Sequence, residues 1–218
     1  MTSGIQTKKT QVVIAGAGPV GSVAAIRLAQ QGVDVILLEA GPDCAQDLRA
    51  STFHPPTLEM LESIDVTDAL INEGLKAPVF QYRDRGDGEV YAFDLTELAD
   101  ETRHPYRIQC EQYKLARRLT QRLSEMDNAE VLFSHRLVHL EQDDKGVTVH
   151  AETPLHLLRI RADFLIGADG ANSLVRKWLG TGFEGFTYPE KFLTMSTDWP
   201  IENHFEDLAW VNYVSDPE

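Results

Sequence analysis

The chain has 218 residues and a mass of 24.4 kDa, a size that allows one or two domains and a large buried core. Its formal net charge is −14, and such an acidic surface repels phosphate backbones and anionic lipids. We therefore expect no nucleic-acid or membrane partner. The polar N-terminus, without an apolar leader, favours a cytoplasmic location. Cys44 and Cys110 are expected to be reduced thiols, and no histidine spacing predicts a metal site.

The N-terminal residues predict a strand–helix–strand unit. Residues 11–15 form a short β-branched run bounded by glycine, which is typical of a buried parallel strand. A helical pattern begins at Ser22 and stops at Gly32, and residues 33–38 predict a second buried strand. Units of this kind have parallel strands and a right-handed crossover.

Shorter elements are expected in the middle of the chain. Residues 43–56 predict a loop, and the helix that follows has Thr57 as its expected cap. Two β-prone runs around a glycine-rich turn predict a hairpin over residues 79–93. Apolar residues at helical spacing predict a long helix from Glu111.

The sequence after the predicted long helix indicates a β-meander, followed by a second turn from a strand to a helix. Three short antiparallel strands are expected, the last over residues 156–161. Residues 164–166 predict a separate buried strand, and residues 174–178 predict a helix. Strand-like pieces follow at residues 192–197 and 208–214.

A glycine-rich turn lies between the first predicted strand and its helix: Gly16, Ala17, Gly18, Pro19, Val20 and Gly21. In this pattern the first glycine allows a tight turn, the second lets the backbone approach a pyrophosphate, and the third lets helix and strand pack closely. The helix N-terminus adds N–H groups and the positive end of its dipole. Glu39 ends the second strand, where a carboxylate accepts hydrogen bonds from the adenosine ribose. This carboxylate disfavours a 2′-phosphate, so the turn predicts a site for FAD or NAD.

A second glycine and acid pattern, residues 167–170, joins a predicted strand to a helix. In this context Asp169-Gly170 resembles the Asp-Gly motif of the group A FAD-dependent aromatic hydroxylases, flavoprotein monooxygenases similar to p-hydroxybenzoate hydroxylase. The segments 49–52, 112–115 and 183–187 resemble further parts of that family. The resemblance covers nearly the whole chain.

The resemblance implies an α/β fold. A Rossmann-like FAD-binding domain with a β-meander would comprise residues 1–76 and 105–180, and the start of a mixed-sheet substrate domain would comprise residues 77–104 and 181–218. The implied cofactor-binding residues are Gly16, Ala17, Gly18, Pro19, Val20 and Gly21 at the pyrophosphate, Glu39 and Ala40 at the ribose, Arg49 and Gln112 along the FAD, Leu137 at the adenine, and Asp169 for both FAD and NAD(P)H.

Alternatives remain open for several of these residues. Arg49 could belong to a surface ion pair, Gln112 could be an ordinary helix-start residue, and Asp169 could be only a helix cap. His54 is a less favoured candidate for contact with substrate or flavin. No residue is assigned as catalytic, because in this family the cofactor carries the chemistry.

The implied function is hydroxylation of a small aromatic, phenolic substrate by FAD, with O₂ and with NAD(P)H as a transient co-substrate. No second Gly-Asp motif in a strand-to-helix context follows Gly170, so we expect the N-terminal portion of such an enzyme, with weak or absent FAD retention. A homo-oligomer or a complementing C-terminal fragment is a possible partner. An inactive nucleotide- or partner-binding module and an NAD-dependent reductase remain alternatives.

Overall fold

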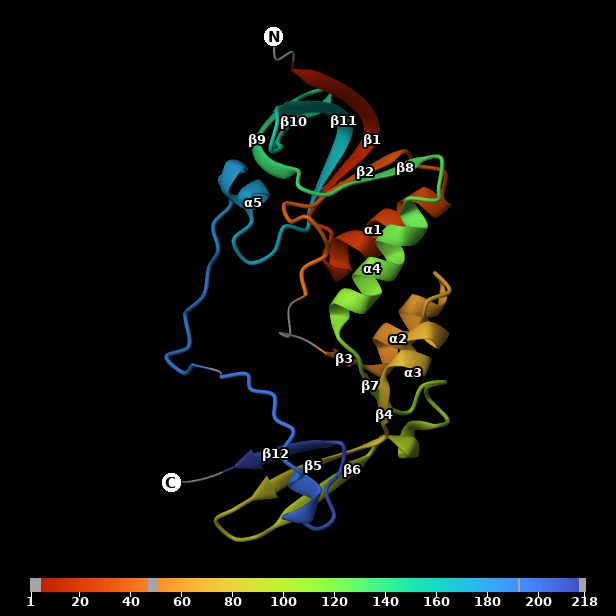
Figure 1. The fold of residues 1–218 in the computed structure, drawn as a ribbon, viewed down its shortest axis with the longest axis vertical. Coiled ribbons are helices and arrows are strands. Elements are labelled where there is room, and N and C mark those ends of the chain that lie inside the picture. Colours follow the sequence, from red (N-terminus) through yellow and green to blue (C-terminus); the bar gives the residue numbers. More distant parts are fainter. Residues whose placement is uncertain (1–4, 47–50, 192, 216–218) are drawn as a thin grey trace. The chain divides into compact units, whose positions relative to one another are not determined.

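The structure, a computed structural model, describes residues 5–46, 51–191 and 193–215 (Figure 1). The chain divides into two compact units. The first unit comprises residues 1–47 and 112–189, and the second comprises residues 48–111 and 190–218. The domain boundaries expected from the sequence stay a prediction.

A six-stranded sheet of order β8-β2-β1-β11-β10-β9 forms the centre of the first unit (Figure 1). β1 (Gln6–Ala15), β2 (Val35–Leu38) and β8 (Ala129–Leu132) are parallel, and β1 is also parallel to β11 (Leu157–Gly167). All four residues of β2 are buried, as expected for a parallel strand covered on both faces. The predicted Rossmann-like arrangement is confirmed.

The other half of this sheet is an antiparallel meander. β9 (Arg136–Asp143) pairs with β10 (Gly146–Glu152), and β10 pairs with the first part of β11. β11 therefore joins the meander to the parallel strands, since its other edge pairs with β1 as far as Gly167. The prediction of two separate strands over 156–161 and 164–166 is wrong, because the ladder with β1 continues past Asp163.

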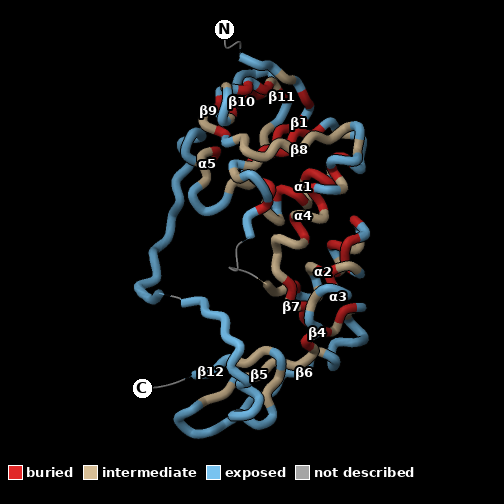
Figure 2. Tube along the Cα trace, viewed as in Figure 1, coloured by how far each residue is buried: buried red, intermediate tan, exposed pale blue. Residues whose placement is uncertain are grey.

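Helices of the first unit cover this sheet. α1 (Pro19–Gln30) packs against α4 (Gln112–Leu123), and α5 (Leu174–Trp178) packs against β9. α4 buries Leu115 and Leu119 on the face that the sequence spacing predicts, and Figure 2 shows buried residues along both α1 and α4.

The second unit contains a small sheet of order β3-β7-β4 and two short helices. β7 (Arg107–Gln109) pairs antiparallel with β3 (Thr52–Phe53) and with β4 (Leu75–Ala77). The helices are α2 (Pro55–Glu62) and α3 (Thr67–Glu73).

The start of α2 differs from the prediction. His54, not Thr57, occupies the N-cap position of α2, without a capping hydrogen bond from its side chain, and the helix begins two residues before Thr57. Pro55 and Pro56 occupy its first turn. An N–H group at this place has no acceptor within the helix, so proline loses no hydrogen bond there, and its fixed φ already suits a helix.

A further three-stranded sheet of the second unit has the order β12-β5-β6. β5 (Val79–Asp84) and β6 (Val90–Asp94) form the predicted hairpin, and β12 (Val211–Ser215) adds in parallel to β5. Two short 3₁₀ helices, η1 (Leu95–Leu98) and η2 (Ile201–Asn203), lie outside these strands. Residues 193–197 form no strand, and Phe192 lies outside the described residues.

Candidate functional site

The glycine turn after β1 is closely packed at its first and third glycines. Gly16 has a φ of +101°, and a Cβ atom there would lie 2.4 Å from the carbonyl oxygen of Ala168. A Cβ atom on Gly21 would lie 1.9 Å from the carbonyl oxygen of Gly16. Both positions therefore require glycine, because any side chain would displace backbone. The expected roles of these two glycines in the turn and in helix–strand packing are consistent with this geometry.

The second glycine has open space beside it. Gly18 precedes α1 as its N-cap, with φ −70° and ψ −178°, and a Cβ atom there would meet no atom of the described residues within 4 Å, apart from those of its chain neighbours. No side chain caps α1, and its first turn carries no acidic residue. The positive end of the helix dipole is thus not offset by a carboxylate from that turn. An open backbone at the N-terminus of α1 fits the pyrophosphate of FAD.

The Glu39 carboxylate holds this turn from the neighbouring strand. Its Oε2 accepts the N–H of Ala17 at 2.9 Å, and its Oε1 accepts the N–H of Gly41 at 2.9 Å. Each carboxylate oxygen has a second lone pair, which leaves acceptor capacity for ribose hydroxyls. Glu39 therefore organises the loop after β2, and its expected contact with the ribose stays a prediction.

Asp169 organises the second turn, at the end of β11. Its Oδ1 accepts the hydroxyl of Ser173 at 2.6 Å, and its Oδ2 accepts the N–H of Leu174 at 2.7 Å. Ser173 in turn accepts the N–H of Arg176, so both side chains satisfy the start of α5. The capping role of Asp169 is thus real, and a contact with FAD or NAD(P)H stays a prediction.

The two turns lie side by side because β1 and β11 are adjacent parallel strands. Ala15 and Gly167 are partners in the ladder, and the N–H of Ala168 donates to the carbonyl of Ala15 at 2.8 Å. Carboxyl ends of neighbouring parallel strands meet at one edge of a sheet, which is the usual ligand site in α/β folds. The two glycine turns, which are far apart in the sequence, therefore lie at one edge of the sheet.

The other candidate residues lie at varied positions. Gln112 is the first residue of α4 and is half-buried, and Ala40 is exposed beside Glu39. The side chain of Leu137 is buried in the sheet core, so only its backbone remains for an adenine contact. Arg49 lies outside the described residues. The roles of these four residues stay predictions.

An ion pair that the sequence does not suggest fixes the loop after β2. Asp43 pairs with Arg117 on α4, and the guanidinium hydrogen bond lowers the pKa of the Asp43 carboxyl. Asp43 also accepts the N–H of Cys44, and burial raises the pKa of that thiol. The loop that follows Glu39 is thereby tied to the helix that begins with Gln112. Only three-dimensional packing joins Asp43 to Arg117, so no local sequence signal could have found the pair.

Comparison with known proteins identifies the family. Residues 9–217 match the family described as FAD binding domain. The chain belongs to this family. It is 33% identical over 207 residues to para-nitrophenol 4-monooxygenase of a Pseudomonas strain, which covers 94% of the chain and 51% of that protein. It is 35% identical over 195 residues to 6-hydroxy-3-succinoylpyridine 3-monooxygenase of Pseudomonas putida, which covers 89% of the chain and 50% of that protein.

Solved structures agree with these sequence relatives. p-Nitrophenol 4-monooxygenase from Pseudomonas putida superposes with a TM-score of 0.79 at 31% identity, over 84% of the chain and 46% of that structure. Anhydrotetracycline hydroxylase from Streptomyces rimosus superposes with a TM-score of 0.72 at 32% identity, over 82% of the chain and 35% of that structure. The expected kinship with FAD-dependent aromatic monooxygenases is confirmed. The chain spans about half the length of the curated relatives it matches first.

Within residues 5–46, 51–191 and 193–215, no helix is long and apolar enough to cross a bilayer. The same residues contain no cluster of three or more His, Cys, Asp or Glu side chains arranged to hold a metal ion.

Proposed function

We propose that the chain is the FAD-binding portion of a monooxygenase that hydroxylates a small phenolic substrate with O₂ and NAD(P)H. The observation that carries this proposal is the packing of the Gly16 turn against the Ala168 backbone, beside the open N-terminus of α1. The substrate class is supported by the relatives, which include p-nitrophenol 4-monooxygenases.

The proposed cofactor contacts follow from the two turns. The backbone at Gly18 and the first turn of α1 would bind the FAD pyrophosphate, and the free lone pairs of Glu39 would accept the ribose hydroxyls. FAD bound there would supply the redox chemistry that couples oxidation of NAD(P)H to hydroxylation of the aromatic ring, with one oxygen atom of O₂ entering the product and the other leaving as water. The protein then binds and orients the cofactor, and Asp169 keeps the second turn rigid beside it.

The remaining parts of the proposal concern contacts outside these turns. Arg49, Gln112 and the backbone of Leu137 are proposed to extend the FAD site, and the carboxylate of Glu39 favours a cofactor without a 2′-phosphate. The proposed partners are a second copy of the chain or a complementing C-terminal fragment. Light scattering of the purified chain, alone and with added FAD, measures whether a second copy associates.

The test is oxidation of NADH and NADPH by the chain with FAD in excess, with and without p-nitrophenol or 4-hydroxybenzoate. The proposal predicts FAD binding, faster NAD(P)H oxidation and O₂ uptake when the aromatic compound is present, and a product heavier by one oxygen atom. FAD binding without any response to an aromatic compound would instead favour an inactive nucleotide-binding module. NADH oxidation that needs no flavin would favour the reductase.

A further inference from the structure

β6 forms one edge of the β12-β5-β6 sheet (Figure 1). It pairs with β5, and no other strand of the described residues lies beside it. Every residue of β6 is exposed, which holds for no other strand that the structure describes. Three of its side chains are large and apolar, and 45% of Val90, 55% of Tyr91 and 47% of Phe93 are exposed. An exposed apolar edge strand can pair through its free N–H and C=O groups with another strand.

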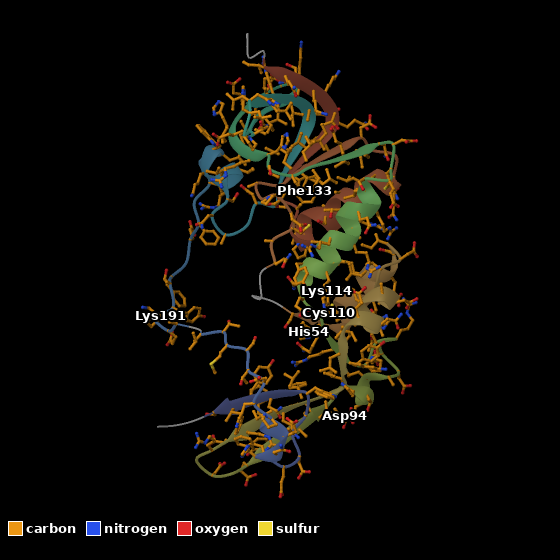
Figure 3. The ribbon with its side chains drawn as sticks, in the orientation of Figure 1. His54, Asp94, Cys110, Lys114, Phe133 and Lys191 are labelled. Atoms are coloured by element: carbon orange, nitrogen blue, oxygen red, sulfur yellow. The ribbon has the colours of Figure 1, made fainter. Side chains whose placement is uncertain are left out.

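Native proteins usually protect a free edge with charges, proline or a covering segment, and β6 has little such protection. Its sequence contains no lysine or proline, and its one charged residue is Asp94 at its end. The Asp94 carboxylate, labelled in Figure 3, accepts both the N–H and the hydroxyl of Thr96. The edge strand β9 of the six-stranded sheet differs, because the indole of Trp178 donates to its Val138 carbonyl at 3.0 Å. The backbone edge of β6 is therefore open where that of β9 is covered.

Hydrogen bonds at the two ends of β6 show which of its backbone groups face the free edge. The carbonyl of Glu89 accepts the N–H of Asp84 at 2.9 Å. The N–H of Leu95 donates to the carbonyl of Pro78, also at 2.9 Å. In an antiparallel pair every second residue bonds to the partner strand, so the odd-numbered residues of β6 bond to β5. The backbone groups that point away from β5 belong to the other three residues: Val90, Ala92 and Asp94.

We propose that β6 pairs antiparallel with β6 of a second copy of the chain, around a two-fold axis at Ala92. In this register Ala92 lies opposite the partner's Ala92, and Val90 lies opposite the partner's Asp94. All of these residues direct their N–H and C=O groups to the free edge, so each opposite pair can exchange two hydrogen bonds. The same strand serves both copies, which is the self-complementary contact that a two-fold dimer requires.

The side chains favour this register over its neighbours. Tyr91 would lie opposite the partner's Phe93 at positions without hydrogen bonds, where side chains come closest and aromatic pairs are favourable. Phe93 already stacks on Phe80 with ring centroids 4.9 Å apart, so the row of rings would continue across the axis. A shift by one residue would place the free backbone groups opposite groups that are bound to β5. A shift by two residues would leave one end of each strand unpaired.

The inference rests on the part of the proposed function in which a second copy is the partner, and it names the contact surface. A pair of five-residue strands is smaller than the interface of about 1,200 Å² that a stable complex needs. We therefore expect weak and reversible association, with a dissociation constant of about 10–100 μM.

Sedimentation equilibrium of the purified chain without FAD, from about 1 μM to about 1 mM, measures this association. Each copy has a net charge of −14, and salt at about 0.15 M screens the repulsion beyond about 8 Å. We expect monomers and dimers in reversible exchange and no larger species, because a two-fold contact closes on itself. Monomers at every concentration, or growth into larger assemblies, would overturn the proposal.

Opposite charges placed at Ala92 test the register. The residue is exposed, so Ala92→Lys and Ala92→Glu should fold with the melting temperature of the wild type. Either variant alone places two like charges opposite each other, and its dissociation constant should rise at least about ten-fold. An equal mixture places a lysine opposite a glutamate and should associate at least as tightly as the wild type. Self-association that both variants keep, or a mixture that stays monomeric, would contradict the register.

The matched control is Val214→Lys on β12, the opposite edge of the same sheet. Val214 is 56% exposed, so the added charge is as accessible as at Ala92, and the association should not change. A loss in Val214→Lys equal to that in Ala92→Lys would show that added charge, and not its place on β6, weakens the contact.

These measurements need neither FAD nor NAD(P)H, so they fail separately from the proposed hydroxylation. Dimers that Ala92→Lys disrupts, in a chain without flavin-dependent oxidation, would keep the β6 contact and remove the hydroxylase. Flavin-dependent oxidation by a chain that sediments only as a monomer would do the reverse. Dimers that the charged variants leave intact would keep the second copy as partner and overturn β6 as its contact surface.

Discussion

The carboxylate of Glu39 accepts the N–H of Ala17 at 2.9 Å, which joins the end of β2 to the glycine turn after β1. Its other oxygen accepts the N–H of Gly41. The same side chain that is expected to face a ribose therefore also sets the shape of the loop around it. The Glu39 carboxylate therefore has a structural role before any ligand binds.

Replacing Glu39 with glutamine should destabilise the chain even without cofactor. An amide has one acceptor oxygen, so its NH₂ group would face the N–H of Ala17 or Gly41. We expect a loss of about 1–3 kcal/mol in the free energy of unfolding, measured by urea denaturation. The control Glu152→Gln, at an exposed strand end, should change little. Equal stability of Glu39→Gln and wild type would show that these hydrogen bonds do not matter.

The third glycine of the turn should tolerate no side chain. Gly21→Ala places its Cβ atom 1.9 Å from the carbonyl oxygen of Gly16, so backbone must move. Overpacking of this kind costs about 1–3 kcal/mol or more, and thermal unfolding of the purified variant measures it. A melting temperature equal to that of the wild type would mean that α1 lies farther from the turn than the structure shows.

Asp169 should matter for stability through its capping contacts. Asp169→Ala removes the acceptor of the Ser173 hydroxyl and of the Leu174 N–H, which should cost about 1–2 kcal/mol in the free energy of unfolding. Asp144→Ala, in an exposed hairpin turn, is the matched control. FAD affinity measured on the same variants separates the two roles: a loss of affinity beyond that in the control supports a contribution of this turn to cofactor binding.

The ion pair between Asp43 and Arg117 predicts a pH dependence of stability. The pKa of Asp43 is lowered in the folded chain, so the pair stabilises the fold above the ordinary aspartate pKa. This contribution is lost as the pH falls through the lowered value. The difference in melting temperature between wild type and Asp43→Asn should therefore be present at neutral pH, vanish in acid, and shrink with added salt. A difference that persists in acid would point to another cause.

The positions of the two turns are predictable from the sequence because each motif lies directly between its own strand and helix. Gly16, Gly18 and Gly21 form a pattern whose strand and helix lie directly beside it, and Asp169 follows a strand in the same way. Parallel pairing of β1 with β11 then brings the turns together at one edge of the sheet. That pairing follows from the fold class, and the fold class follows from the motifs.

Contacts between distant segments could not be predicted in this way. The pairing of Asp43 with Arg117 depends on how α4 packs, and the single strand β11 depends on neighbours along both of its edges. The guanidinium of Arg107 lies over the ring of Phe80 and donates to the hydroxyl of Tyr213 only because β7 and the β12-β5-β6 sheet come together within the second unit. None of these relations leaves a periodic or spacing signal in the sequence.

The most direct test of the account is an FAD titration of the wild-type chain and of Gly18→Ala, followed by flavin fluorescence. Apart from its chain neighbours, the added methyl meets no atom of the described residues within 4 Å, so the variant should fold with an unchanged melting temperature. The methyl would nevertheless occupy the space that the pyrophosphate needs. The account predicts saturable one-to-one binding by the wild type and an affinity at least about ten-fold lower for Gly18→Ala. No binding by the wild type, or equal affinity in the two proteins, would contradict the claim that this turn binds FAD.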